Sequence, residues 1–502
     1  METYHFKNIN YTYRGYEKKA LEEVSFSVEA GDFIVVCGAS GSGKSTLLKC
    51  LKEANPDFGF VMQEPSTQIV TDKVYHELAF GMENQGVLPE KMKHAIAETA
   101  TYFGMEGWLE KDTCFLSGGE KQILNLASVL VMAPDVILLD EPTSQLDPMA
   151  AVTFIDLLKR LNTQLGLTVI LVEQRLEEVL SVCDRMLVLH EGRVAAYGSV
   201  QEVYSGICES GLSEEYLSYM PSYVRLYHRL SPDKSGCPRS VKECRKWFLE
   251  KKPECRRKDI EQENVRTKSP HEENKSCTVS CKNVFFRYEK KGRDILKDVS
   301  YEAYAGNIYG IVGGNGSGKS TFLKILVQAE RCYHGKADCT QKIAYLPQEP
   351  KYMFIGDRIC DIIKSDEAVQ KFGLTEILNR HPYDVSGGQM QRAAMAYLYE
   401  MDAGIYLFDE PTKGMDPYWK KRFADWLLEL SRAGKTVILV SHDVEFAANA
   451  CEYISMCFHG ELSEPVRTEK FFRDHHFYTT AVHRIVRDRY PELVSERFLY
   501  EK

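Results

Sequence analysis

The stretch Gly38-Ala39-Ser40-Gly41-Ser42-Gly43-Lys44-Ser45-Thr46 decides the fold class of this 502-residue chain. Its spacing, Gly-x-x-x-x-Gly-Lys-Ser, is that of the phosphate-binding P-loop. A strand-like run at residues 33–36 precedes it and a helix-like run at 46–51 follows it, which is the context that the motif requires. The glycines let backbone N–H groups converge on phosphate oxygens, and the helix N-terminus adds partial positive charge. The stretch therefore predicts an α/β domain that binds a nucleotide.

The same pattern recurs as Gly313-Gly314-Asn315-Gly316-Ser317-Gly318-Lys319-Ser320-Thr321, between a strand-like run at 308–312 and a helix-like run. Three further pairs follow the two loops in the same order: Gln63-Glu64-Pro65 with Gln348-Glu349-Pro350, Ser117-Gly118-Gly119 with Ser386-Gly387-Gly388, and Asp140-Glu141-Pro142-Thr143 with Asp409-Glu410-Pro411-Thr412. Matches in one order indicate a duplicated domain. We expect a first domain over residues 1–230, a charged linker over 231–276 and a second domain over 277–502.

The offset between the copies locates their differences. It is 275 residues at the P-loop lysines, 285 at the glutamines and 269 at the Ser-Gly-Gly serines. The second copy therefore has ten more residues between lysine and glutamine, and sixteen fewer between glutamine and serine.

Both P-loops offer the same chemistry to a bound ATP. Lys44 and Lys319 are expected to reach the β- and γ-phosphates, while Ser45 and Ser320 offer a hydroxyl to Mg²⁺. The predicted ATP-binding residues of the loops are Gly38, Ser40, Gly41, Gly43, Lys44, Ser45 and Thr46 in the first copy, and Gly313, Asn315, Gly316, Gly318, Lys319, Ser320 and Thr321 in the second.

A carboxylate pair follows an apolar run in each copy. The runs at 136–140 and 405–409 are typical of buried parallel strands, whose C-terminal ends face ligands in α/β sheets. Asp140 and Asp409 are expected to hold Mg²⁺, and Glu141 and Glu410 suit a general base or water-orienting group. The alternative is that these acids only cap the helices that follow.

Ser-Gly-Gly stands about twenty residues before each carboxylate pair, ahead of helix-like stretches at 122–132 and 391–401. The triplet alone usually marks a turn. Together with the P-loop, the glutamine and the Asp-Glu-Pro-Thr segment, it gives the chain a close resemblance to two ATP-binding cassette (ABC) ATPase domains in tandem. The resemblance implies an α/β fold with a RecA-like core and a helical subdomain in each domain.

The resemblance also implies roles for further residues. Tyr13 and Tyr288, each 31 residues before a P-loop lysine, fit the aromatic that stacks on adenine. The alternative is a half-buried strand tyrosine at each place. Gln63 and Gln348 fit the glutamine that senses Mg²⁺ and the γ-phosphate. The implied Mg²⁺ ligands are Ser45, Gln63 and Asp140 in the first copy, and Ser320, Gln348 and Asp409 in the second.

ABC domains close head to tail, with ATP between one P-loop and the opposite Ser-Gly-Gly, so the resemblance implies intramolecular pairing of the two domains. The implied first site combines Lys44, Asp140 and Glu141 with Ser386 and Gly388. The implied second site combines Lys319, Asp409 and Glu410 with Ser117 and Gly119.

The two copies differ after the last catalytic strand. The second copy has His442 at the position of the family's switch histidine, whereas the first has Gln174. Glutamine can donate a hydrogen bond to a phosphate but cannot become cationic. The first copy also has Ile123 where the second has Arg392. We therefore expect hydrolysis mainly at the site of Glu410 and His442; the alternative is that Gln174 substitutes adequately.

The chain has a formal net charge of −9, and 44% of its residues are hydrophobic. This balance is ordinary for a globular protein and argues against general affinity for nucleic acid. The apolar runs are far shorter than the ~20 residues of a membrane span, and no signal-peptide pattern opens the chain. Residues 233–275 favour a solvated linker with a short helix near 241–249; a basic contact surface is the alternative.

Three segments resemble the ATPases of energy-coupling factor (ECF) transporters, which import vitamins or transition-metal ions. They are Gln63 through Gly81, Val172 through Val179, and Phe477 through Arg484. The resemblance implies a transmembrane coupling protein docked after the glutamine, a small solute-binding membrane protein, and a place at the cytoplasmic face of the cell membrane. No nucleic-acid partner is expected. The alternatives are a soluble ABC-F-type translation factor acting on ribosomes and a non-transport ATPase.

Overall fold

The computed structural model describes residues 3–15, 18–144, 146–209, 213–232, 236–255, 276–496 and 499. The chain divides into two compact units. The first contains residues 1–225 and 233–240, and the second contains residues 226–232 and 241–502.

The central sheet of the first unit places five parallel strands beside one antiparallel edge strand. In spatial order the strands are β4 (Gly59–Val61), β5 (Val136–Asp140), β6 (Thr168–Val172), β3 (Phe33–Gly38), β7 (Arg185–His190) and the antiparallel β8 (Arg193–Ser199). β3, β5 and β6 are buried along their whole length. This burial explains their near-continuous Val, Ile and Leu, because both faces of a parallel sheet are covered.

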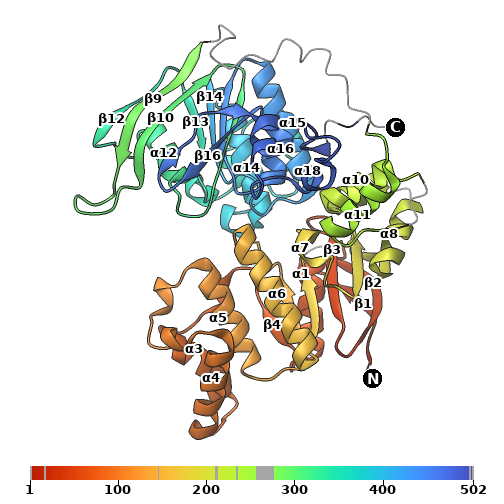
Figure 1. Ribbon diagram of the computed structural model, residues 1–502. Helices are drawn as coiled ribbons and strands as arrows, with labels where there is room; N and C mark the ends of the chain where they lie inside the picture. Colours follow the sequence, from red (N-terminus) through yellow and green to blue (C-terminus); the bar gives the residue numbers. More distant parts are fainter. Residues whose placement is uncertain are drawn as a thin grey trace. The chain divides into compact units, whose positions relative to one another are not determined.

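A separate antiparallel pair, β1 (Thr3–Tyr11) and β2 (Leu21–Glu29), packs its apolar face into the same core as the sheet and α1 (Lys44–Ala54). A helical subdomain forms where α3 (Val74–Asn84), α4 (Pro89–Phe103) and α5 (Gly118–Leu130) pack together (Figure 1). The other helices of this half of the chain are α2 (Pro65–Gln68), α6 (Pro148–Leu165), α7 (Leu176–Val179), α8 (Val200–Glu209), α9 (Ser213–Tyr219) and α10 (Ser222–Leu230).

The second unit repeats this strand order. Its sheet runs β13 (Ile343–Leu346), β14 (Ile405–Asp409), β15 (Thr436–Val440), β11 (Ile308–Val312), β16 (Tyr453–Phe458) and β17 (Glu461–Leu462), with β18 (Val466–Arg467) also on β16. Its antiparallel sheet runs β10 (Leu296–Tyr304), β9 (Cys277–Phe286) and β12 (His334–Cys339). Its helices are α11 (Val241–Lys251), α12 (Lys319–Leu326), α13 (Asp366–Lys371), α14 (Gly387–Glu400), α15 (Pro417–Arg432), α16 (Val444–Ala450), α17 (Thr468–Asp474) and α18 (Ala481–Val486). The two units thus share one α/β fold.

The two differences in length have structural counterparts. The ten additional residues of the second copy contribute β12, which adds a third strand to the antiparallel sheet (Figure 1). The sixteen missing residues shorten the helical subdomain, where the six-residue α13 stands in the interval that α3 and α4 occupy in the first unit.

The short helix expected near 241–249 is present as α11, but it is not wholly solvated. Cys244 and Phe248 are buried, and the helix packs on α18 within the second unit. Within the predicted linker, residues 233–235 and 256–275 lie outside the described residues. Among the helices that the structure describes, none combines the length and the apolar character needed to cross a bilayer.

Candidate functional site

Each P-loop joins the end of a central strand to the start of a helix, β3 to α1 and β11 to α12. Glycine is required at the two ends of the first loop. A Cβ atom on Gly38 would lie 2.2 Å from the carbonyl oxygen of Leu189, and one on Gly43 would lie 2.7 Å from that of Ala20. Gly313 and Gly318 are equally confined in the second unit. The backbone thus forms a tight cradle that opens onto a helix N-terminus, the arrangement that binds phosphate.

The P-loop lysines are buried against their own loops. The Nζ atom of Lys44 donates to the carbonyl oxygens of Gly38 and Ala39, at 2.9 and 2.8 Å. Lys319 donates in the same way to Gly313 and Gly314, at 2.9 Å each. Each ammonium group is therefore held beside the backbone that would cradle the phosphates.

The predicted hydroxyl and carboxylate ligands of Mg²⁺ meet in both units. Ser45 Oγ donates to Asp140 Oδ1 at 3.0 Å, and Ser320 Oγ donates to Asp409 Oδ1 at 2.9 Å. Burial raises the pKa of Asp140, and it raises the pKa of Asp409 to about 6. These are the oxygen ligands that Mg²⁺ prefers, and a cation would offset the cost of burying the carboxylates.

Tyr13 and Tyr288 follow β1 and β9 rather than lying within them. Their hydroxyl groups pair with the hydroxyls of Thr46 and Thr321 at 2.8 and 3.1 Å. Their rings are 41% and 53% exposed. The alternative of half-buried strand tyrosines is therefore wrong. Both rings lie at the edge of a P-loop with area available for stacking.

Glu141 and Glu410 share a strained backbone. Both have left-handed φ angles, 43° and 50°, in a region that non-glycine residues rarely adopt. The backbone N–H of each donates to the neighbouring strand, to Val172 at 2.9 Å and Val440 at 3.0 Å. The ends of the sheets thus hold both carboxylates in an orientation that costs energy, which is characteristic of functional positions.

The surroundings of these two carboxylates differ. Glu141 accepts from Gln174 Nε2 at 2.5 Å and from Gln63 Nε2 at 2.9 Å. Glu410 instead lies 2.8 Å from His442 Nδ1 and accepts from the His442 backbone N–H at 3.2 Å. Gln63 and its counterpart Gln348 are both exposed. Both carboxylates therefore contact the switch position, through an amide in one unit and an imidazole in the other.

The Ser-Gly-Gly serines cap the exposed N-termini of α5 and α14. Ser117 accepts from the Glu120 N–H, and Ser386 accepts from the Gln389 N–H, at 3.3 Å in each case. In both, the side chain of the third helical residue accepts from the serine N–H, which completes a capping box. Gly119 and Gly388 lie in the first turns of these helices. Each helix start can therefore receive an anion.

One residue of this region was not predicted from the sequence. Glu173 is 2% exposed, and its Oε1 accepts from Thr143 N at 3.1 Å and from Thr143 Oγ1 at 2.6 Å. Burial raises its pKa to about 7, with a further contribution from the nearby Glu141. One feature of the sequence could have indicated Glu173: it is a carboxylate that directly follows an apolar strand. The equivalent position in the second unit is Ser441.

Two P-loops with matching hydroxyl, carboxylate and capped-helix elements define a class, the tandem P-loop ATPases. The family model "ABC transporter" matches residues 21–144 and 296–413. A "Putative ABC transporter ATP-binding protein" of Bacillus cereus is 33% identical over 548 residues, covering 98% of this chain and 97% of that protein. The chain belongs to the ABC transporter family of ATP-binding proteins. It is therefore an ATPase whose domains bind ATP, generally with Mg²⁺.

Two more distant similarities extend the comparison. The "Putative HMP/thiamine import ATP-binding protein YkoD" of Bacillus subtilis is 26% identical, covering 89% of this chain and 88% of that protein. A crystal structure of an archaeal ribosome recycling factor bound to a ribosomal stalk protein covers 93% of this chain and 91% of its own, with a TM-score of 0.60 and 20% identity. At that identity the second similarity concerns the fold alone.

Proposed function

We propose that the chain energises an ECF-type importer of a vitamin or a transition-metal ion, and that it works at the cytoplasmic face of the membrane. ABC ATP-binding proteins generally partner with transmembrane components. The observation that carries the proposal is an exposed apolar surface on the first helical subdomain, after the glutamine. There Val70 is 62% exposed and Phe80 is 44% exposed. Exposed apolar side chains on one subdomain can supply the contacts of a protein or membrane interface.

This apolar surface is presented on a fixed backbone. Glu77 is buried, and its Oε2 accepts from Val70 N at 3.1 Å, from Thr71 N at 2.9 Å and from Thr71 Oγ1 at 2.8 Å. One buried carboxylate thereby ties the loop to α3. A preformed contact surface loses less conformational entropy on binding, which favours docking of a helix from a coupling protein.

The second unit also exposes apolar residues after its glutamine. Tyr352 and Ile355, shortly after Gln348, are 70% and 93% exposed. Each unit therefore has exposed apolar side chains that a partner could contact, even though the second lacks the long helices of the first. The name of the B. subtilis relative, which refers to thiamine import, also supports an importer.

The nucleotide chemistry follows from the residues at each P-loop. Lys44 and Lys319 would neutralise phosphate charge, and Ser45 with Asp140, and Ser320 with Asp409, would hold Mg²⁺. The Mg²⁺ held by these residues would supply positive charge against the negative charge of the phosphates. Gln63, Gln348, Tyr13 and Tyr288 would contact the bound nucleotide. Glu141 and Glu410 would orient the attacking water.

ATP would then close the two domains head to tail, with Ser386 and Gly388 completing the Lys44 site and Ser117 and Gly119 completing the Lys319 site. Fusion raises the effective concentration of one domain for the other. We propose that hydrolysis occurs mainly at the site of Glu410 and His442. Loss of the γ-phosphate contacts would reopen the pair and move the docked membrane protein.

An affinity purification of the tagged full-length chain from membranes in mild detergent tests the importer proposal. We expect a polytopic coupling protein, with or without a small solute-binding membrane protein, among the proteins identified by mass spectrometry. The double variant Val70→Asp with Phe80→Asp should lose these partners. The control variant Leu165→Asp, at an exposed apolar residue of α6, should keep them. Recovery of ribosomal proteins and RNA instead would contradict the proposal and favour the translation factor.

A further inference from the structure

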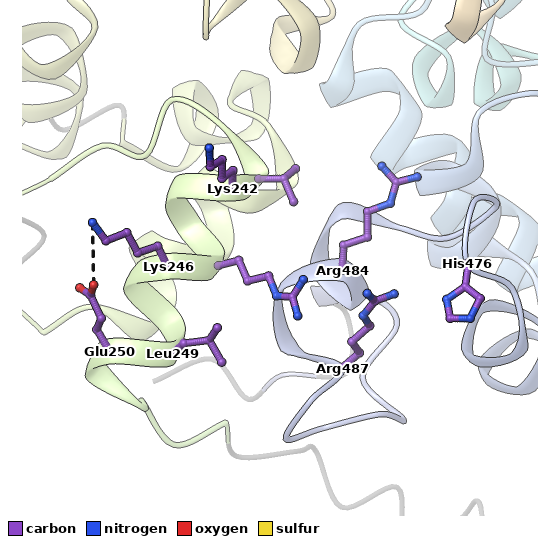
Figure 2. A pocket seen from close by; sticks show the side chains of 9 residues that line it. Lys242, Lys246, Leu249, Glu250, His476, Arg484 and Arg487 are labelled. Carbon is purple, nitrogen blue, oxygen red and sulfur yellow. Dashed lines mark ion pairs between the residues drawn. The ribbon is translucent and has the colours of Figure 1, made fainter.

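A basic cleft lies within the second unit, between α11 on one side and α18 with the preceding loop on the other. Its volume is about 680 Å³. Figure 2 shows Lys242, Lys246 and Leu249 on α11, with Arg484, Arg487 and His476 on the opposite side. The lining residues are Val241, Lys242, Arg245, Lys246, Leu249, Glu250, His476, Arg484 and Arg487.

Both sides of the cleft are anchored in the unit. On α11, the buried Phe248 ring packs edge-on against Tyr490, with ring centroids 6.3 Å apart. On α18, Val482 and Ile485 are fully buried. The basic side chains therefore extend from fixed backbone, which is a condition for a specific site.

The basic side chains that line the cleft outnumber the carboxylates that could neutralise them. Arg245 pairs with Asp488 at 2.7 Å, and Lys246 pairs with Glu250 at 4.0 Å. Within the described part of the chain, Lys242, Arg484 and Arg487 form no ion pair. The whole chain carries a net charge of −9, so this excess is local. Such a concentration attracts anions and raises their rate of association.

We propose that this cleft binds a phosphate-bearing anion with at least two negative charges, either free in solution or as the headgroup of a lipid. One arginine guanidinium can donate two parallel hydrogen bonds to the oxygens of a phosphate. Two arginines, Arg484 and Arg487, line the cleft from one short segment. The volume lies in the range of small-ligand sites, about 300–1,000 Å³. Among the described lining residues there is no Phe, Tyr or Trp ring on which a nucleobase could stack, which disfavours single-stranded nucleic acid.

Direct binding measurements test this inference without reference to transport. The P-loop variant Lys44→Ala with Lys319→Ala removes the competing phosphate sites and serves as the parent. Calorimetry with inorganic pyrophosphate probes the free anion. Flotation with phosphatidylcholine vesicles, with and without phosphatidylglycerol, probes the headgroup. Adding Arg484→Glu and Arg487→Glu should weaken binding by at least about tenfold, because two attractive contacts become repulsive.

A matched charge reversal elsewhere in the unit controls for net charge. Lys297→Glu with Lys421→Glu changes two exposed lysines outside the cleft and should leave affinity within about twofold, because distant surface charges are screened. Arg484→Gln with Arg487→Gln repeats the test without introducing acid. ATPase activity of the cleft variants in the chain with intact P-loops reports whether they fold.

Each outcome decides the inference. Pyrophosphate binding that depends on Arg484 and Arg487 identifies a free phosphate ligand, and dependent binding to anionic vesicles alone identifies a headgroup. Binding of an RNA oligonucleotide without either phosphate probe would overturn the inference in favour of a nucleic-acid surface. Absence of binding, or equal binding by the cleft and control variants, would also overturn it. None of these results depends on the importer proposal.

Discussion

Glu141 and Glu410 occupy equivalent strained positions, but the switch position beside them carries an amide in one unit and an imidazole in the other. The amide of Gln174 donates to Glu141, whereas the imidazole of His442 contacts Glu410. An imidazole can become cationic and stabilise phosphate charge, and an amide cannot. The two copies therefore differ at a group that contacts each carboxylate directly.

The buried Glu173 predicts a pH-dependent stability. Its pKa is raised from 4.5 to about 7, so between these values the folded chain keeps a proton that the unfolded chain has released. The free energy of unfolding then falls as pH rises through this window, by about 3 kcal/mol in total. Glu173→Gln removes the ionisation. Relative to the wild type, this variant should gain about 2–3 kcal/mol between pH 5 and pH 8 in chemical denaturation.

The exposed Glu98 on α4 provides a matched control. Glu98→Gln removes a carboxyl at an exposed position, so it separates the effect of burial at Glu173 from the loss of a carboxyl as such. A difference between Glu173→Gln and wild type that stays constant from pH 5 to pH 8 would contradict the raised pKa.

Residue types at fixed spacing were enough to predict several contacts at the P-loops. The pairing of Ser45 with Asp140, and of Ser320 with Asp409, follows from two parallel strands of one sheet that end at the same edge, with a third strand between them. Glu173 was missed because its raised pKa depends on burial beside Thr143 and Glu141, which are thirty or more residues away. Sequence spacing does not report such a desolvated environment.

At the scale of elements, the second helical subdomain is fastened to its core by a side chain that the first unit lacks. Arg392 on α14 donates to the carbonyl oxygens of Phe372 and Gly373 at 2.9 Å each, and so caps the end of α13. Its guanidinium also lies 4.2 Å from the ring centroid of Trp419 on α15. The first unit has Ile123 and Ala150 at these positions.

Arg392→Ile, which introduces the residue of the first unit, should loosen α13. The variant loses a cation–π contact and leaves two carbonyl groups without their donor, a cost of about 2–3 kcal/mol. Hydrogen exchange should become faster by at least about tenfold in the amides of α13 and the following turn, if opening is local. Lys421→Ile, at an exposed position on α15, should leave these amides unchanged. Equal protection in Arg392→Ile and wild type would contradict this role.

Most elements that carry the site could be predicted, because an apolar run that precedes a P-loop or an Asp-Glu pair is rarely anything other than a buried strand. β5, β14 and the helices after both P-loops lie where the sequence placed them. The packing of α11 on α18 could not be predicted. Its amphipathic pattern is short, and its partner lies more than two hundred residues further along the chain.

At the scale of the whole molecule, both copies keep the same order of strands in the central sheet, but they differ in the helices and strands that surround it. The first unit keeps long helices and an exposed apolar surface, and the second adds β12 and the Arg392–Trp419 contact. Each unit also retains its own P-loop, carboxylate pair and capped helix. We propose that this one chain carries two ATP sites with unequal catalytic roles.

Steady-state ATPase activity of Glu410→Gln and Glu141→Gln, measured side by side with wild type, tests this claim most directly. Both changes keep the side-chain shape and remove only the carboxylate, and melting curves should confirm that both variants fold. Glu410→Gln should reduce the rate by about 100-fold or more, the usual contribution of a general base. Glu141→Gln should retain at least about half of the activity, because the site with His442 is unchanged. Equal losses in the two variants would contradict the account.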